Sequence, residues 1–562
     1  MKIIRFLILT CCYALPVLSG TKPVIKPGFP VLLARDNIWW GPLLSGPIIV
    51  DIDGDNKKEI VQSAGNQVFI IRYDGTSQSG WPKGMTFNTQ QNASIGDING
   101  DGSPDIVARD RDYFYNNSKI YAWNNQGRVY SGFPKNAPMV SNQPKTPILF
   151  DFNNDRKLDI VYTSNYTLNI IDYTGLSLPG WPVTIAGKNR LDNLRIGNIS
   201  SADTVEILVA NGDSLYIFRL DGSLCCRPIS APLIDHTISC LTVADQDGDG
   251  ISEVFLSLGS LGSPSSGYKI GLYSIFSGFL DGWPKFIAEE DNYSIEPHSR
   301  ADLNGDGQPE IIWVDVLGFL RVYNSAGIAL NGFPVHSFIN QMSGIDPTVG
   351  DIDGDSDLEI FCDNNMNFND SSHYHVYHHD GTEVEWSPLT IPWVTCFNSP
   401  AISDLEGDGS LEIAFVSTDP YRFDVYLYVY TIAGVAYASE RFPWPMHAHD
   451  PQHTYWYDYK YPWTRLDLKS PSGKHSLTTA SINYPNPFNT VTRISFILPK
   501  AMEVRISIYD LNGREVESLG TYQHSRGEHT FTWDGRENSS GIYLCCIEGD
   551  DYKLIRKMIL LR

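Results

Sequence analysis

A ten-residue phrase occurs eight times along this chain of 562 residues, and it restricts the possible folds more than any other feature. Two of its copies are Asp51-Ile-Asp-Gly-Asp-Asn-Lys-Lys-Glu-Ile60 and Asp302-Leu-Asn-Gly-Asp-Gly-Gln-Pro-Glu-Ile311. Oxygen-bearing side chains occupy positions 1, 3, 5 and 9 around a glycine-bearing turn, and an aliphatic residue occupies position 10. A fixed period of about 50 residues predicts an array of supersecondary units that bury their faces against one another.

The spacing of these oxygen atoms indicates a cation. Alternate side chains of a curled loop point to one centre, where carboxylates repel one another unless a hard ion lies between them. The spacing is similar to the start of an EF-hand loop, but an apolar β-type run such as Ile311–Trp313 follows in place of a helix. We therefore expect a calcium loop that joins two strands. About seven Ca²⁺ sites are expected, with these ligands: Asp51, Asp53, Asp55, Glu59, Asp97, Asn99, Asp101, Asp105, Asp151, Asn153, Asp155, Asp159, Asp245, Asp247, Asp249, Glu253, Asp302, Asn304, Asp306, Glu310, Asp351, Asp353, Asp355, Glu359, Asp404, Glu406, Asp408 and Glu412.

The fourth copy of the phrase departs from the others. Asn198, Ser200 and Ala202 replace the acids at positions 1, 3 and 5, and only Glu206 keeps its acidic character. Too few oxygen ligands remain there to hold a divalent cation. We expect no calcium in this unit.

Two further markers recur along the units: an alternating strand that ends at a glycine turn, and an aromatic–proline pair such as Trp81-Pro82, which is degraded in two units to Arg227-Pro228 and Ser387-Pro388. Proline stops a strand at its edge, and the aromatic ring is expected to pack between units. Nine such marks bound eight units, which predicts an all-β chain with an eight-bladed (alternatively seven-bladed) β-propeller over residues 28–455. Because the first mark, Phe29-Pro30, precedes the first loop, residues near 28–45 are expected to share a blade with the last unit.

In their order and spacing, these markers resemble the FG-GAP/VCBS repeats of extracellular propellers, the group that includes the heads of integrin α-subunits. The resemblance implies calcium bound within individual blades. Integrin heads have seven blades, whereas eight units are present here.

A different module follows a linker over residues 456–480. From Ile482 to Arg562, strand-like runs alternate with turn signals, which suggests a small immunoglobulin-like sandwich. The run Tyr484-Pro-Asn-Pro-Phe-Asn489 and the segments after it resemble the type A C-terminal sorting domain of the type IX secretion system, although Thr490 stands where proline is usual. The resemblance implies export by the type IX machinery across a Gram-negative outer membrane, followed by release or surface attachment. A purely structural repeat is the alternative.

Composition and the N-terminus agree with a secreted protein. Residues 1–19 read as a signal peptide, with a lipoprotein signal at Cys11 or Cys12 as the weaker alternative. No other stretch is apolar enough to span a bilayer. The net charge of −23 argues against nucleic acid or an anionic membrane as partner. The seven cysteines beyond the signal peptide are expected to be small buried hydrophobes.

Two histidine clusters could bind metal, but each has a simpler interpretation. His447, His449, Asp450 and His453 fit a hydrogen-bonded closing segment as well as a metal cluster. The cluster of His373, His375, His378 and His379 fits the solvated face of an outer strand.

The sequence contains no motif for nucleophilic, metalloprotease or phosphate chemistry. We expect a calcium-stabilised surface protein that binds a glycan or an extracellular protein, or serves in adhesion. An extracellular polysaccharide lyase or hydrolase on a propeller scaffold is the alternative, and a purely structural surface protein is a third. Trp39, Trp40 and Tyr113 are candidate recognition residues, because flat aromatic faces suit sugar rings.

Overall fold

The structure is a computed structural model that divides into two units, residues 1–461 and 462–562, and each is described by itself. The residues that it describes are 22–35, 46–89, 91–112, 117–138, 146–185, 191–201, 204–230, 236–246, 249–260, 268–288, 298–315, 318–336, 346–363, 371–393, 398–456, 481–484, 488–498, 502–510, 514–524, 527–536, 538–549 and 552–560. The expected signal peptide, all but the first residue of the linker, and Trp39, Trp40 and Tyr113 lie outside these ranges.

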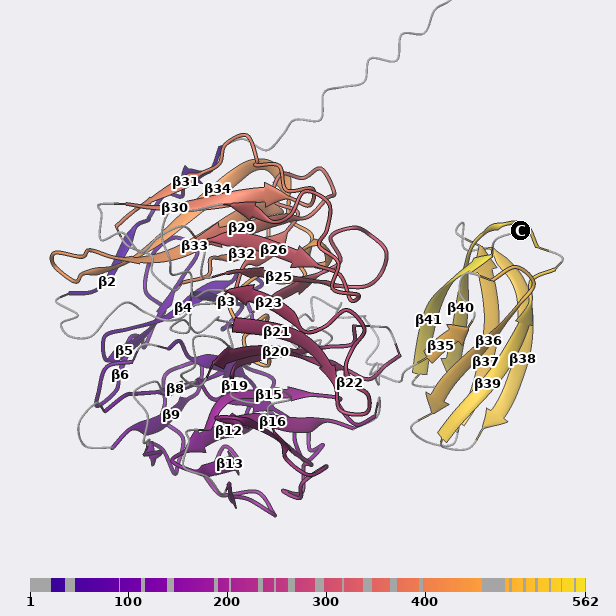
Figure 1. Cartoon of the computed structure of the whole chain (residues 1–562), viewed down its shortest axis with the longest axis horizontal. Coiled ribbons are helices and arrows are strands. Elements are labelled where there is room, and N and C mark those ends of the chain that lie inside the picture. Colours follow the sequence, from indigo (N-terminus) through magenta and orange to yellow (C-terminus); the bar gives the residue numbers. More distant parts are fainter. Residues whose placement is uncertain are drawn as a thin grey trace, which may run out of the picture. The chain divides into compact units, whose positions relative to one another are not determined.

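The described residues of the first unit form eight antiparallel sheets, one for each copy of the phrase (Figure 1). The strands of the first four sheets are β3 (Ile48–Val50), β4 (Glu59–Ala64), β5 (Gln67–Ile71) and β6 (Lys83–Gly84); β7 (Ser94–Gly96), β8 (Asp105–Arg109), β9 (Lys119–Trp123) and β10 (Lys135–Asn136); β11 (Ile148–Phe150), β12 (Asp159–Ser164), β13 (Thr167–Ile171) and β14 (Val183–Thr184); and β15 (Leu191–Gly197), β16 (Glu206–Asn211), β17 (Ser214–Phe218) and β18 (Ile229–Ser230).

The other four sheets repeat this order. Their strands are β19 (His236–Ala244), β20 (Glu253–Ser260), β21 (Tyr268–Ser274), β22 (Gly278–Phe279) and β23 (Lys285–Ala288); β24 (Ser299–Ala301), β25 (Glu310–Val314), β26 (Phe319–Tyr323) and β27 (Val335–His336); β28 (Thr348–Gly350), β29 (Glu359–Asp363), β30 (Ser371–His378) and β31 (Leu389–Pro392); and β32 (Ala401–Ser403), β33 (Ser410–Thr418) and β34 (Val425–Ala436) with β1 (Val24–Ile25) and β2 (Val31–Ala34). A short 3₁₀ helix, η1 (Ser439–Arg441), follows β34.

Each phrase joins the first strand of its sheet to the second, as expected. In seven of the eight sheets the acid at position 9 is the first residue of the second strand, for example Glu59 in β4 and Glu310 in β25. Every residue of β4, β8, β16 and β25 is buried. Both faces of these strands are covered by neighbouring sheets, which explains why the strands lack a polar alternate position.

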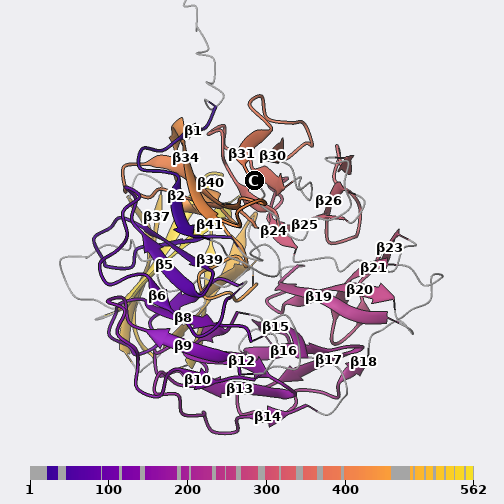
Figure 2. The ribbon, with the colours of Figure 1, turned by 90° about the vertical axis from the view of Figure 1, so that its left-hand side faces the viewer.

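The sheets follow one another around a circle in chain order, and the last one meets the first (Figure 2). The Lys58 amide, in the first phrase, donates to the Leu405 carbonyl in the eighth, at 2.7 Å. Strands β1 and β2 from the N-terminal side pair with β34. The fold is therefore an all-β propeller whose last sheet contains N-terminal strands. This confirms the expected sharing for residues 31–34, while 36–45 lie outside the described residues.

The aromatic–proline pairs lie between sheets, as predicted. The indole Nε1 of Trp81 donates to Asn125 O at 3.0 Å, and Trp181 and Trp283 make the matching bond to Leu220 O and Ser325 O in their next units. In six of the pairs a glycine precedes the aromatic residue and packs on the glycine turn of the next unit. At Gly132, with φ +93°, a Cβ would lie 2.1 Å from the Thr174 carbonyl oxygen, so a side chain is excluded there.

A closing segment, Trp444–Trp456, crosses the middle of the ring. Its backbone carbonyls accept hydrogen bonds from the first strands of five different sheets, donated by Val349 in β28, Ile402 in β32, Ile95 in β7, Leu149 in β11 and Val243 in β19. The first strands of neighbouring sheets also contact one another, as β3 does with β32 and β15 with β19. A segment that reaches five such strands must lie along the axis of the ring.

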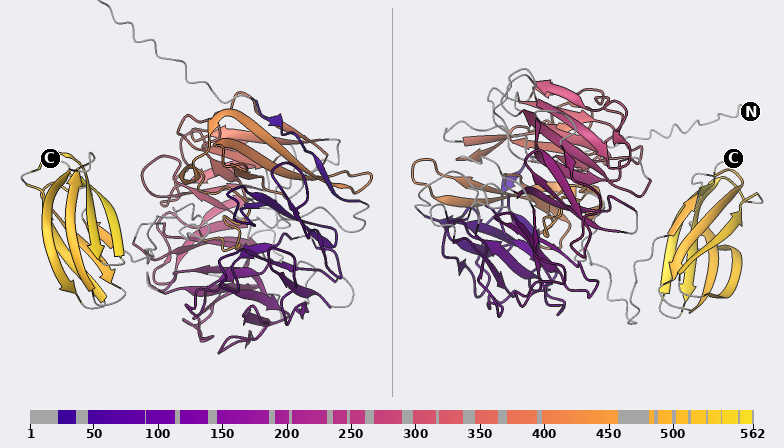
Figure 3. Two further views of the ribbon diagram at one scale, coloured as in Figure 1. Left: turned by 180° about the vertical axis from the view of Figure 1, so that it is seen from behind. Right: turned by 60° about the horizontal axis from the view of Figure 1, so that its bottom comes forward.

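The second unit consists of two facing sheets (Figure 3). Its strands are β35 (Ser481–Tyr484), β36 (Val491–Leu498) and β39 (Gly527–Asp534) in one sheet, and β38 (Glu515–His524), β37 (Met502–Asp510), β40 (Gly541–Gly549) and β41 (Tyr552–Leu560) in the other. Ile494 and Trp533 of the first sheet share one core with Ile506 and Ile547 of the second. The unit is a small β-sandwich.

The structure describes six of the seven cysteines beyond the expected signal peptide. Four of the six are buried, as expected, whereas Cys225 and Cys226 are half-buried. In the part of the chain that the structure describes, no helix is long and apolar enough to cross a membrane.

Candidate metal-binding loops

The position 1 aspartates hold the backbone of their own loops. Asp302 Oδ1 accepts from the Gly305 amide at 2.8 Å, and its Oδ2 accepts from the Gly307 amide at 2.8 Å. Asp51 does the same for Gly54 and Asn56, at 2.7 and 3.0 Å. These bonds fold the loop into a tight turn and bring positions 1, 3 and 5 toward one side.

The acid at position 9 has one role in all eight loops. One of its carboxylate oxygens accepts a hydrogen bond from the backbone amide of position 2, at 2.7–3.1 Å. The amides belong to Ile52, Ile98, Phe152, Ile199, Gln246, Leu303, Ile352 and Leu405. The bond ties the start of the second strand to the start of the loop and fixes the direction of the other carboxylate oxygen.

In the first loop, that other oxygen has no partner. Glu59 is fully buried, and its Oε1 makes no hydrogen bond. Ligand atoms of Asp51, Asp53 and Glu59 all lie within 4.8 Å of one another. Burial, together with Asp53, Asp51 and Asp55, raises the pKa of Glu59 to about 8. A buried carboxylate among like charges is costly, and a cation would remove that cost.

The second, third and sixth loops share this electrostatic problem. Burial raises the pKa of Asp105, Asp159 and Glu310 to about 7. The Tyr130 hydroxyl donates to Asp105, and the Asn304 amide to Glu310, each at 2.7 Å. The third loop borders a cavity of about 470 Å³ whose lining includes Asn153, Asp155, Asp159 and Asp172. In the fifth loop, Asp245 and Asp249 are described but Asp247 is not.

The fourth loop satisfies its acid without further carboxylates. Hydroxyls of Ser200 and Thr204 donate to Glu206 Oε1, Thr204 at 2.8 Å. The Ile199 amide occupies the other oxygen at 2.9 Å. Both carboxylate oxygens therefore have neutral donors. The absence of a cation from this unit stays a prediction, and Ala202 lies outside the described residues.

The eighth loop already contains a cation from the protein. Lys26, which is 7 % exposed, donates from Nζ to Glu406 at position 3 and, at 3.2 Å, to Glu412 at position 9. Burial opposes the charge of Lys26, but the two glutamates outweigh it and raise the pKa of Lys26. The ammonium lies where the sequence pattern places calcium, a contact that the repeat alone did not reveal.

The seventh loop combines two groupings that share Asp353. Ligand atoms of Asp351, Asp353 and Asp355 lie within 4.8 Å of one another, and so do those of Asp353, Glu359 and His378. In the described part of the chain, such groupings of three ligand atoms occur in the first and seventh loops.

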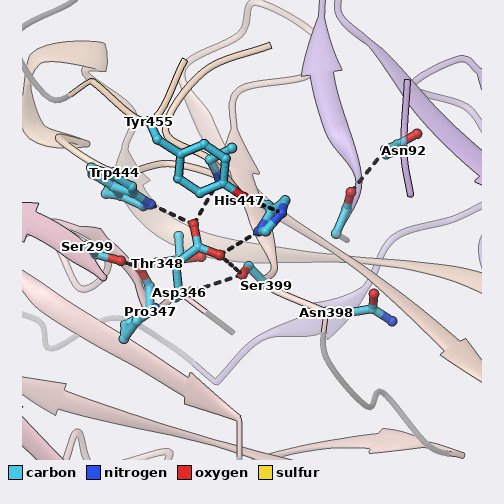
Figure 4. A network of polar contacts seen from close by, with 12 residues as sticks. Asn92, Ser299, Asp346, Pro347, Thr348, Asn398, Ser399, Trp444, His447 and Tyr455 are labelled. Atoms are coloured by element: carbon cyan, nitrogen blue, oxygen red, sulfur yellow. Dashed lines mark hydrogen bonds and ion pairs between the residues drawn. The ribbon is translucent and has the colours of Figure 1, made fainter. Parts of the chain in front are cut away.

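His447 of the closing segment belongs to a hydrogen-bonded network around Asp346 (Figure 4). Asp346 accepts from Trp444 Nε1 at 2.9 Å and the Ala448 amide at 2.8 Å, and its Oδ1 pairs with His447 Nδ1 at 2.5 Å. Burial alone would raise the pKa of Asp346, but His447, Trp444 and Ser399 together lower it to about 2.

The far nitrogen of His447 meets the Tyr455 hydroxyl at 2.9 Å. Burial lowers the pKa of the nearby His453 to about 3, so this imidazole is neutral. The segment is therefore the hydrogen-bonded closing turn. Asp346, which the pattern did not single out, is its anchor.

Comparisons with known proteins agree with this architecture. Residues 51–108, 97–162 and 302–362 match the FG-GAP-like repeat, and residues 483–561 match the secretion system C-terminal sorting domain. The chain thus contains FG-GAP-like repeats followed by a sorting domain, as the sequence indicated. That domain marks the chain for export by the type IX machinery and is the part that the machinery recognises.

Solved structures resemble the fold at low identity, and no curated protein matches the sequence. The V. cholerae biofilm matrix protein Bap1 is 12 % identical, with a TM-score of 0.36 over 75 % of this chain and 92 % of that one. BBS1N in complex with ARL6DN is 11 % identical, with a TM-score of 0.38 over 73 % and 99 %. The Dos1 propeller is 10 % identical, with a TM-score of 0.38 over 73 % and 96 %. Likenesses at these scores carry no argument about function.

Proposed function

We propose that this chain is a secreted propeller, stabilised by Ca²⁺ in its blade loops, that binds a glycan or an extracellular protein at the outer surface of a Gram-negative bacterium. The sorting domain supports the location. The role in binding or adhesion rests on how the connections between strands are distributed over the two ends of the propeller.

Calcium is supported by the first loop. Glu59 Oε1 is buried without a hydrogen-bond partner, and a carboxylate oxygen of Glu59 lies within 4.8 Å of ligand atoms of Asp51 and Asp53. Carboxylate oxygens are the ligands that Ca²⁺ prefers. The same set of position 1, 3, 5 and 9 residues recurs in the second, third, fifth and sixth loops. We propose Ca²⁺ in these five loops first. In the seventh and eighth loops, protein groups compete for the same carboxylates.

The two ends of the propeller differ in their connections. The phrases join first to second strands and the glycine turns join third to fourth strands, so both lie at one end of each sheet. At the other end, the turn between second and third strands ranges from two residues (65–66) to nine (110–118). Connections that vary on a rigid scaffold are where binding residues collect.

Exposed aromatic side chains support recognition at this variable end. Tyr421 is 69 % exposed and Phe423 is 46 % exposed, and both lie between β33 and β34. Tyr166, between β12 and β13, is also exposed. Large flat side chains held on a rigid turn lose little entropy when they stack on a sugar ring or a protein side chain. This distribution is the observation that carries the proposal.

A glycan array and a panel of extracellular matrix proteins test binding. We expect the double substitution Tyr421→Ser with Phe423→Ser to weaken binding of any ligand found by about tenfold or more, because paired aromatic contacts are typical hot spots. Phe276→Ser is the matched control, since Phe276 is 68 % exposed in a turn at the opposite end. Equal loss in the control and the double variant would place recognition elsewhere.

Two further measurements bear on this proposal. Incubation with acidic and neutral polysaccharides, followed by ultraviolet absorbance of unsaturated products and by reducing ends, detects a lyase or hydrolase. Calcium-dependent cleavage would replace the binding interpretation.

Truncation before Ile482 should leave a folded propeller that stays in the periplasm of the native host, because the two units have separate cores. Surface display of that truncated chain would contradict the sorting role.

A further inference from the structure

The seventh loop differs from the others in the residue that faces its position 9 acid. In the β29–β30 hairpin, Glu359 pairs with His378. The corresponding residues of the eight hairpins, in chain order, are Arg72, Asn124, Asp172, Arg219, Ser274, Asn324, His378 and Thr431. The seventh unit alone among these eight has an imidazole at this position.

The imidazole points into the loop. His378 Nδ1 lies 3.2 Å from Glu359 Oε1 and 3.9 Å from Asp353 Oδ2. The Ile352 amide holds the other oxygen of Glu359 at 2.7 Å, which directs Oε1 toward the imidazole. Glu359 is fully buried and Asp353 is 6 % exposed. One nitrogen and two carboxylate oxygens thus converge on one point, with their ligand atoms within 4.8 Å of one another.

The oxygen ligands of this loop are altered at the same time. Arg441 Nη1 donates to Asp351 Oδ2 at 2.6 Å, so the position 1 carboxylate already has a cationic partner. Ca²⁺ takes six to eight oxygen ligands, whereas an imidazole with two carboxylates suits zinc and related transition metals. The Arg441 pair weakens the set of oxygen ligands that Ca²⁺ needs, and His378 adds a nitrogen donor beside the remaining carboxylates.

We propose that the seventh loop binds a transition-metal divalent ion, with Zn²⁺ as its representative, through His378, Glu359 and Asp353. This inference deepens the proposed calcium function, because it assigns a different metal to one of the loops. Three protein ligands leave a tetrahedral ion one further position, open to water. One ion would join the loop after β28, the start of β29 and the end of β30, at one end of their sheet.

The test is a titration of the full mature chain with Zn²⁺ in millimolar Ca²⁺, which keeps the all-oxygen loops occupied. Isothermal calorimetry of the wild type should show one tight Zn²⁺ equivalent. His378→Asn, which installs the residue of the second and sixth units, should weaken that equivalent by at least about tenfold. His375→Asn is the matched control on the same strand, where His375 pairs with Glu383 at 2.7 Å. It should leave Zn²⁺ binding unchanged.

A second readout locates the ion. Anomalous scattering at the zinc edge should give a peak among Asp353, Glu359 and His378. Co²⁺ in place of Zn²⁺ should show the visible absorption of a tetrahedral site that His378→Asn abolishes. Equal Zn²⁺ affinity in the wild type and His378→Asn, or an anomalous peak elsewhere, would overturn the proposal and leave a plain histidine–glutamate hydrogen bond. A calcium titration of the same protein tests the other loops separately, so the two proposals fail independently.

Discussion

The first and fourth loops share one backbone-to-acid hydrogen bond but surround their buried acid in different ways. In both, the position 9 glutamate accepts the position 2 amide, Glu59 from Ile52 and Glu206 from Ile199. In the fourth loop, hydroxyls occupy the second oxygen. In the first, that oxygen has no hydrogen-bond partner, and Glu59 lies among the carboxylates of Asp51 and Asp53. The fourth loop thus meets its buried acid with neutral donors, whereas we propose that the acid-rich first loop takes a cation.

The eighth loop shows a third solution, in which Lys26 supplies the positive charge. Hydroxyls thus meet the position 9 acid in the fourth loop and an ammonium does so in the eighth, and we propose that a metal does so in the first. Four experiments test this comparison, beginning with the one of largest expected effect.

Chelation should have the largest effect, because it would leave the acid-rich loops without a cation and would not change the fourth loop. We expect EDTA to lower the melting temperature markedly, because each site at about 100 times its Kd contributes on the order of 2.7 kcal/mol. Calorimetry with EDTA and after Ca²⁺ is added back measures this effect. An unchanged transition would mean that the buried acids are balanced without metal.

Without the Lys26 ammonium, the eighth loop should contain buried carboxylates that no positive charge balances, as the first loop does without metal. Lys26→Met leaves two glutamates unpaired, and loss of one partner of a buried pair costs about 3–5 kcal/mol. Ca²⁺ should recover part of this loss by entering the vacated position. Urea unfolding with and without Ca²⁺ measures both effects, with Lys22→Met, at an exposed position of the same segment, as control. If Lys26→Met were no worse than Lys22→Met, Lys26 would not be the internal cation.

Matched substitutions compare the first and fourth loops directly. Glu206→Gln disturbs satisfied hydrogen bonds and should cost about 1–3 kcal/mol, equally with and without Ca²⁺. Glu59→Gln removes a metal ligand, so its cost should be large in Ca²⁺ and small in EDTA. Thermal unfolding of both variants in both buffers decides the matter. An equal response of the two variants to Ca²⁺ would contradict the proposed difference between the first and fourth loops.

The pH dependence of the metal-free protein should be the smallest effect. Glu59 has a pKa raised to about 8 in the fold, from the ordinary 4.5, and Asp105 has one raised to about 7 from 3.8. Between these values the folded chain keeps protons that the unfolded chain has released, so the free energy of unfolding in EDTA falls as pH rises. Melting temperatures at pH 5 and pH 8 test this, and Ca²⁺ should reverse the trend. A metal-free protein that becomes more stable at pH 8 would contradict these raised pKa values.

The loops, the glycine turns and the aromatic–proline pairs were readable in the sequence, because each is a local pattern whose physical cause lies within a few residues. The partners of those patterns were not. Lys26 meets Glu406 across 380 residues of chain, and Asp346 meets His447 across 101. Nothing near Lys26 distinguishes it from a surface lysine until β1 and β2 are placed beside β34. A repeat period predicts the units of an array. It does not predict the single residues through which the first and last units contact each other.

The closing segment also has a consequence for the order in which the chain folds. The last sheet needs β1 and β2, and the axis needs residues 444–456, so both ends of the propeller must be present before the ring is complete. Contacts of such long sequence separation make closure slow relative to the formation of each hairpin. Individual sheets can form as the chain emerges. The ring, however, is a late event that awaits the final residues before the sorting domain.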